Sequence, residues 1–110
     1  VADEKVIAAL KAMEANIEHP VPRDQLAVIA GMSLRQLERS FKGRLGRGVH
    51  EHYLALRLAR ARQLLRESSL PILEVAVATG FGSASQFSRA YRHAFGMLPS
   101  QVRRKAREGR

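Results

Sequence analysis

The sequence predicts an all-α fold of about seven helices, in which two helix-turn-helix subdomains are joined by a long linker helix. Three observations lead to this fold class. Aromatic residues make up only 5% of the chain and Trp is absent, so the core is built mostly from aliphatic residues. Apolar residues recur at helical spacing along much of the chain. One segment pattern also occurs twice, about fifty residues apart.

The repeat extends over a helix, a turn and a second helix in each copy. Four segments carry it: QLAVIAGM (25–32) over EVAVATGF (74–81), and QLERSFKGRLG (36–46) over QFSRAYRHAFG (86–96). Pro22 and Pro71 stand in register, and each suits the first turn of a helix. Gly31 and Gly80 also stand in register, and each suits the left-handed position that ends a helix. The second copy carries one extra residue in its turn.

Each turn is followed by a predicted recognition helix, over about 34–45 and about 84–95. Ser33 with Gln36, and Ser83 with Gln86, fit the capping box, in which both side chains satisfy backbone N–H groups. Apolar residues then recur every four positions, which predicts one buried stripe in each helix: Leu37, Phe41 and Leu45, then Phe87, Tyr91 and Phe95.

The glycine-rich segment GFGSASQ (80–86) has two interpretations, a phosphate-binding loop or a turn between helices. A dinucleotide loop needs G-x-G-x-x-G, and its third glycine is Ser85 here. The corresponding segment of the first copy, AGMSLRQ, lacks the glycine doublet but keeps the cap and the apolar stripe. We therefore interpret GFGSASQ as a turn.

The remaining elements frame the two copies. An amphipathic helix is predicted from about Asp3 to Ile17, and a short final helix from Ser100 to about Lys105. The 19 residues of 49–67 contain no Gly or Pro and predict a linker helix about 28 Å long. Its predicted buried stripe is Leu54, Leu58, Ala61 and Leu65. The predicted organisation is a first subdomain (1–48), the linker helix (49–67) and a second subdomain (68–110).

Charge and composition restrict the function. The chain has 19 Lys and Arg against 10 Asp and Glu, a net charge of +9, which indicates a polyanion or an anionic surface as the partner. A basic surface that serves only solubility is the alternative. The absence of Cys excludes disulfides and thiolate zinc sites. His50 and His52 do not have the spacing that shares a metal, so we expect no metal and no cofactor. We find no nucleophile or carboxylate pair that indicates an enzyme, and no apolar run near the ~18 residues of a membrane span.

The segment LPILEVAVATGFGSASQFSRAYRHAFGMLPS (70–100) resembles the signature region of AraC/XylS-type transcriptional regulators. The resemblance extends to that family's first helix-turn-helix and linker helix, which match AGMSLRQLERSFKGRLG and YLALRLARARQLL. It therefore covers nearly all of residues 3–104. It implies the C-terminal, sequence-specific reader of double-stranded DNA in a bacterial-type regulator, located in the cytoplasm at the nucleoid. It also implies a sensor and dimerisation domain N-terminal to the chain, whose sequence begins Val1-Ala2-Asp3 without an initiator Met. Within the family, the sequence resembles the branch whose N-terminal domain is like a class I glutamine amidotransferase.

In the first recognition helix the resemblance places base contacts at Arg35, Glu38 and Arg39. Arg can donate two hydrogen bonds to guanine, and Glu can accept one from cytosine N4. Arg39 has alternative interpretations as a phosphate clamp or a surface ion pair. Glu38 has the alternatives of orienting Arg35 or of discriminating against wrong bases.

In the second recognition helix we expect base contacts from the residues that face outward. Arg89, which aligns with Arg39, is the strongest candidate, and Gln86 can either read adenine or serve the capping box. The short side chains Ala84, Ser85 and Ser88 allow only close, water-mediated or thymine-methyl contacts. The expected base contacts of this helix are Ala84, Ser85, Gln86, Ser88 and Arg89.

Phosphate contacts are expected from basic side chains and from helix N-termini. The candidates are Ser33, Lys42, Arg44, Ser83, Arg92 and Arg103, and solvated surface charge is the alternative for each basic residue. Two features depart from the family pattern. Arg47-Gly48-Val49 stands where the family has Ser-Pro, which predicts a looser start of the linker helix, and Gly43 costs its helix about 1 kcal/mol relative to Ala.

Two other partner classes fit parts of the pattern. An RNA-binding or nonspecific nucleic-acid-binding domain fits the charge, but it is disfavoured because exposed aromatic residues for base stacking are scarce. A protein-interaction surface, such as one that contacts RNA polymerase, is compatible with DNA reading. Salt dependence separates DNA from protein partners, and competition by unrelated duplex separates specific from nonspecific binding.

Overall fold

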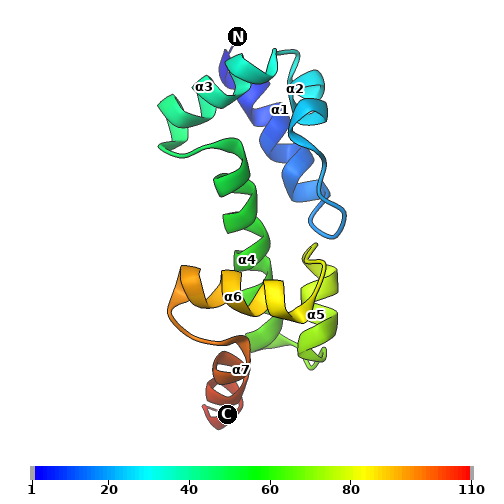
Figure 1. Ribbon diagram of the computed structural model, residues 1–110, viewed down its shortest axis with the longest axis vertical. Coiled ribbons are helices and arrows are strands. Elements are labelled where there is room, and N and C mark those ends of the chain that lie inside the picture. The colour runs from blue at the N-terminus through cyan, green and yellow to red at the C-terminus, as the bar shows by residue number, and fades with distance from the viewer. Residues whose placement is uncertain (1, 110) are drawn as a thin grey trace. The chain divides into compact units, whose positions relative to one another are not determined.

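The computed structural model describes residues 2–109, and this part of the chain forms seven α-helices and no strand (Figure 1). The helices are α1 (Ala2–Ala15), α2 (Arg23–Ala30), α3 (Leu34–Leu45), α4 (Val49–Glu67), α5 (Ile72–Ala78), α6 (Ala84–Phe95) and α7 (Pro99–Glu108). The predicted all-α class and the predicted number of helices are confirmed. The helices predicted over 34–45, 49–67 and 84–95 have the predicted bounds, as α3, α4 and α6.

The chain divides into two compact units, Val1–Leu56 and Arg57–Arg110, and the division falls inside α4. The prediction treated 49–67 as a separate linker, whereas α4 contributes buried side chains to each unit. These are Val49 and Tyr53 in the first unit, and Leu58, Ala61 and Leu65 in the second. Leu54, predicted in the buried stripe, is only half-buried, and its neighbour Tyr53 is the buried residue at this turn of the helix.

The first unit packs α1, α2, α3 and the start of α4 around an aliphatic core (Figure 1). Its buried residues include Val6, Ala9, Met13, Leu26, Leu37, Phe41, Val49 and Tyr53. Helix α1 ends at Ala15, two residues before the predicted Ile17, because the Asn16 amide donates back to the Ala12 carbonyl (2.8 Å). The Tyr53 hydroxyl donates to the Asn16 carbonyl and accepts from the Val21 N–H (3.1 Å), so it fixes the segment between α1 and α2.

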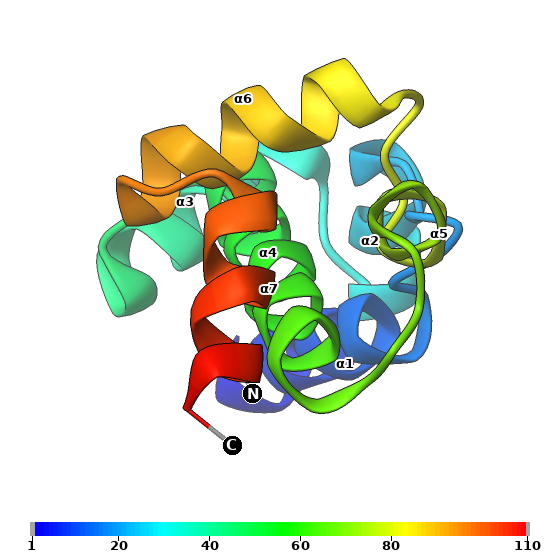
Figure 2. The same cartoon turned by 90° about the horizontal axis from the view of Figure 1, so that it is seen from below.

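In the second unit α6 crosses the second half of α4, and α7 lies at the end of α4 (Figure 1). Figure 2 shows the same helices from below. Four aromatic rings form a continuous series from the α5–α6 turn to the end of α6. Phe81 lies 5.2 Å from Phe87, Phe87 lies 5.7 Å from Tyr91, and Tyr91 lies 4.7 Å from Phe95 between ring centroids. Phe87 and Tyr91 are fully buried, so they fix which face of α6 is turned to solvent.

The turn glycines adopt the conformation that the repeat predicts. Gly31 and Gly80 have φ of 69° and 84°, in the left-handed region where a Cβ is unfavourable. In both copies the next residue closes the helix end: Met32 N–H donates to Ala27 and Phe81 N–H donates to Ala76, each at 3.0 Å. The two units therefore contain the same helix–turn–helix device.

Helix α7 is longer than the predicted 100–105. Pro99 occupies its first turn, where the missing N–H is no loss, and the Gln101 side chain accepts from the Leu98 N–H (2.8 Å). Pro22 and Pro71, in contrast, stand one residue before α2 and α5, as N-cap residues.

Candidate nucleic-acid interface

Helix α3 has one buried face and one basic face. Leu37 and Phe41 are completely buried, as the four-residue stripe predicts. Arg35, Arg39 and Lys42 lie outside this stripe and are exposed. Long cations on an exposed helix face can reach base edges or phosphates without any change in the core.

The N-terminus of α3 is held by a complete capping box. Ser33 Oγ accepts from the Gln36 N–H (3.1 Å), and Gln36 Oε1 accepts from the Ser33 N–H (3.0 Å). This confirms the predicted cap. The Ser33 hydroxyl still has its own hydrogen to donate, so the cap is compatible with a phosphate contact there.

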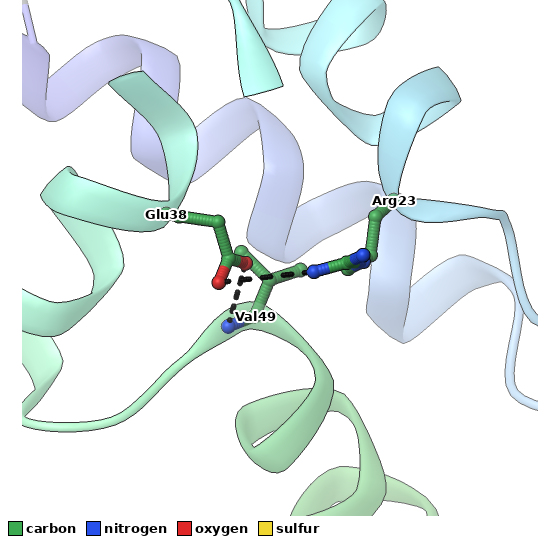
Figure 3. Close-up of polar contacts among 3 residues, drawn as sticks. All are labelled: Arg23, Glu38 and Val49. Carbon is green, nitrogen blue, oxygen red and sulfur yellow. Dashed lines mark hydrogen bonds and ion pairs between the residues drawn. The ribbon is translucent and has the colours of Figure 1, made fainter. Parts of the chain in front are cut away.

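Glu38 is engaged within the protein, which argues against the predicted base contact. Its Oε1 accepts from the Val49 N–H (3.2 Å), and its Oε2 lies 4.0 Å from an Arg23 guanidinium nitrogen (Figure 3). A carboxylate at the first N–H groups of a helix is stabilising because the helix dipole is positive there. Glu38 therefore joins α2, α3 and the start of α4. The absence of Ser-Pro at Arg47-Gly48-Val49 predicted a looser start of the linker helix. The bond from the Val49 N–H to the Glu38 carboxylate instead holds the first residue of α4 in place.

Helix α6 presents a smaller and less basic face. Ala84, Ser85 and Gln86 in its first turn are exposed, and so is Arg89 one turn later. Ser88 is half-buried, whereas Arg92 is exposed. The outward face thus begins with short side chains and ends with two arginines.

The start of α6 departs from the predicted capping box. Ser83 Oγ accepts from the Gln86 N–H (3.1 Å), but Gln86 Oε1 accepts from the Gly82 N–H (3.2 Å) instead of the Ser83 N–H. The extra residue of this turn places Gly82 beside the Gln86 side chain, and a Cβ at Gly82 would lie only 3.0 Å from Gln86 Oε1. The Gln86 oxygen therefore supports the turn, while its NH₂ group keeps its hydrogens for other acceptors.

Arg57 of α4 holds the α5–α6 turn in place. Its Nε donates to the Thr79 carbonyl (2.9 Å) and its Nη2 donates to the Gly80 carbonyl (3.2 Å). The guanidinium carbon lies 4.4 Å from the centroid of the Phe81 ring. Because Phe81 packs against Phe87 of α6, this side chain connects α4 to the second recognition helix. This role could not be predicted from the sequence, because the helical pattern of α4 marks Arg57 only as a residue beside the buried stripe.

Arg103 corrects a predicted phosphate contact. Its side chain is buried, Nε donates to the Leu65 carbonyl (2.8 Å), and Nη2 donates to the Leu64 carbonyl (3.4 Å). Cations that donate to the last carbonyls of a helix stabilise its C-terminus. Arg103 therefore docks α7 against the end of α4 and cannot extend toward DNA. Arg44 forms an exposed ion pair with Asp3, so this candidate phosphate contact already has a partner within the first unit.

His52 is part of the first unit's packing. Its ring meets Phe41 edge-on at 5.8 Å, and its Nδ1 accepts from Arg47 Nε (3.3 Å). Burial lowers the pKa of His52 from 6.5, the Arg47 charge lowers it further, and Glu14 opposes the shift. His52 is therefore neutral at pH 7 in the folded protein. Within residues 2–109 no three His, Asp or Glu side chains gather as a metal site, and no helix there is long and apolar enough to cross a bilayer.

Comparison with known proteins places this arrangement in one family. A family model described as a helix-turn-helix domain matches residues 26–105. The chain is 45% identical over 105 residues to the HTH-type transcriptional regulator ArgR of Pseudomonas aeruginosa, and the match covers 96% of this chain but 32% of ArgR. It is also similar to a transcriptional regulator from Chromobacterium violaceum with an AraC-type DNA-binding domain, at 44% identity and a TM-score of 0.90 over 94% of this chain and 93% of that one. The DNA-binding domain of AdpA, solved in complex with a target DNA, shares the fold, with 24% identity and a TM-score of 0.91 over 97% of this chain and 96% of that one.

Proposed function

This chain belongs to the AraC-type helix-turn-helix family of transcriptional regulators, and we propose that it reads duplex DNA by inserting α3 and α6 into successive major-groove segments. The observation that carries the proposal is the repeated helix-turn-helix device. In both copies the central apolar residues of the predicted recognition helix are buried in its own unit, Leu37 and Phe41 in α3 and Phe87 and Tyr91 in α6, and the opposite face is turned to solvent. The AdpA domain, which has the same fold, was solved with a target DNA, and this supports DNA as the partner of the present chain.

The proposed base contacts come mainly from exposed side chains of α3 and α6, to which the half-buried Ser88 is added. Arg35 and Arg39 would read guanines from α3, and Arg89 would read one from α6. Ala84, Ser85 and Ser88 would admit close approach of the bases at the start of α6. Glu38 would position α3 against α4, and Gln86 would use its remaining NH₂ group if it contacts a base.

The proposed phosphate contacts surround these residues. Lys42 and Arg92 would contact phosphates from the two recognition helices, and the hydroxyls of Ser33 and Ser83 would do so at the helix N-termini. Arg44 would have to exchange its ion pair with Asp3 for a phosphate. An ion pair between exposed residues is weak enough to allow this exchange.

The remainder of the regulator is also part of the proposal. The chain spans 32% of the length of ArgR. We propose that the full-length protein carries an N-terminal sensor and dimerisation domain, of the glutamine amidotransferase-like branch, and that it acts in the cytoplasm at the nucleoid. A contact with RNA polymerase would then be a further property of the protein bound at a promoter.

Selection of bound duplexes from a random pool tests the proposal. We expect a motif with two short boxes roughly 10 base pairs apart. Arg39→Ala should blur one box and Arg89→Ala the other, whereas Arg104→Ala, at an exposed position of α7, should alter neither. Titration of the selected duplex at two salt concentrations then measures the phosphate contribution. Binding without enrichment of any motif, weakening uniformly as salt rises, would refute base reading by this chain.

A further inference from the structure

The second unit contains a groove that DNA reading does not use. It lies between the second half of α4, the end of α6 and α7, and has a volume of about 940 Å³. Its principal lining residues are Arg62, Arg66, Tyr91, Phe95, Val102 and Lys105. We refer to it as the α4–α6–α7 groove. Its volume is in the range of sites that bind small molecules.

A buried hydroxyl at this groove has no hydrogen-bond partner. Tyr91 is fully buried, and its OH group contacts no donor or acceptor among residues 2–109. Phe41 occupies the corresponding position of the first copy and is equally buried. The internal repeat thus shows that the fold needs the ring at this position but not the oxygen. A buried, unpaired hydroxyl is unfavourable, so it indicates a missing partner.

The groove combines positive charge with an apolar wall. Arg62, Arg66 and Lys105 line it, whereas Glu67 is its one acidic lining residue. Phe95 is 37% exposed, and the Arg62 guanidinium lies 5.3 Å from its ring centroid. Burial raises the pKa of the Tyr91 phenol, while the charges of Arg62 and Arg66 oppose this shift, so both cations act at the hydroxyl.

We propose that the α4–α6–α7 groove binds a small organic carboxylate that carries an apolar or aromatic body. The carboxylate would accept a hydrogen bond from the Tyr91 hydroxyl and pair with Arg62, and the body would lie against Phe95 and Val102. Because Tyr91 is fully buried, the Phe95 side chain, whose ring packs 4.7 Å from that of Tyr91, would turn aside to admit the carboxylate and would then cover the body of the ligand. A ligand of this kind satisfies both the unpaired hydroxyl and the excess of positive charge, which a neutral apolar ligand would not.

Amide chemical-shift titration of the 110-residue chain tests the site. 3-Phenylpropionate is the probe, and 3-phenylpropanol is the matched neutral control. We expect saturable shifts confined to the second half of α4, the end of α6 and α7, with the alcohol at least tenfold weaker. Equal shifts from the alcohol, or no saturation with the carboxylate, would overturn the proposal. Shifts from an oligoglutamate peptide alone would also overturn it and would assign the groove to an acidic protein partner.

Two variants identify the residues that bind. Tyr91→Phe should fold, because Phe fills the corresponding position in the first copy, and it should weaken carboxylate binding about tenfold. Arg62→Gln should weaken binding as well, whereas Arg60→Gln, on the same helix but outside the groove, should leave it unchanged. Retention of full affinity in Tyr91→Phe, with an unchanged thermal midpoint, would mean that the hydroxyl is not part of a site.

Discussion

The contacts of Arg57 predict that one substitution in α4 impairs the second recognition helix selectively. Arg57→Lys keeps the positive charge but removes the planar fork that donates to both Thr79 and Gly80. A lysine can satisfy one of these carbonyls, and it lacks the flat face that covers Phe81. Arg60→Lys is the matched control, since Arg60 is exposed on the same helix and its guanidinium donates to the Gln63 side chain (2.9 Å), one turn away.

The size of the effect follows from these contacts. A hydrogen bond from a charged donor contributes roughly 1.5–3 kcal/mol, and the low end applies because Arg57 is only half-buried. Loss of the contact with Phe81 adds about 0.5 kcal/mol. Arg57→Lys should therefore destabilise the second unit by about 2 kcal/mol, which lowers the thermal midpoint by roughly 8–16 °C for a unit of this size. Arg60→Lys should be within about 0.5 kcal/mol of the parent chain.

Thermal denaturation followed by duplex selection tests the reasoning. At a temperature where both variants are folded, Arg57→Lys should lose definition in the box that we propose Arg89 to read and keep the box that we propose Arg39 to read. An equal loss in both boxes would mean that Arg57 acts on the stability of the whole chain. Identical midpoints and motifs for Arg57→Lys and Arg60→Lys would refute the assigned role.

Three further predictions, which use five substitutions, test other parts of the first unit. Glu38→Ala should lower the free energy of unfolding by about 1 kcal/mol, as loss of a helix cap does. If urea denaturation is unchanged and specificity at a cytosine is relaxed instead, Glu38 contacts a base. His52→Gln should flatten the pH dependence of stability, because the folded-state pKa of His52 is depressed: its contribution is fully present above pH 6.5 and is lost as pH falls through the folded-state pKa. Urea denaturation as a function of pH measures the effect, and His19→Gln, at an exposed site, is the matched control for removal of a histidine from the first unit. Gly43→Ala should stabilise α3 by up to about 1 kcal/mol, whereas Gly46→Ala should destabilise it by about 1–2 kcal/mol because φ at Gly46 is +77°. Both sites have open space around a new Cβ, so equal thermal midpoints of the two variants would refute an effect of backbone conformation.

The sequence predicted the elements of this fold better than the partners of individual side chains. Apolar spacing and Ser–Gln pairs gave the bounds of α3 and α6, because these signals are local. The positions of Glu38 and Arg103 depend on which backbone groups of α4 lie beside α3 and α7, and no local pattern encodes that proximity. The predicted capping bond of Gln86 was wrong because the turn has one extra residue. The Gln86 side-chain oxygen therefore accepts from the Gly82 N–H instead of the Ser83 N–H.

The same contacts explain why net charge overstates the basic surface available to DNA. Arg57 and Arg103 donate to carbonyls of the backbone and stabilise the ends of α5 and α4. Arg44 pairs with Asp3 before any DNA is bound. Because the salt dependence of binding counts cations at phosphates, with a slope of about −0.9 for each contact, it reports only those that remain. The charge of +9 thus indicates the class of partner, while in the proposed mode of binding the exposed faces of α3 and α6 would determine how much of that charge can act on DNA.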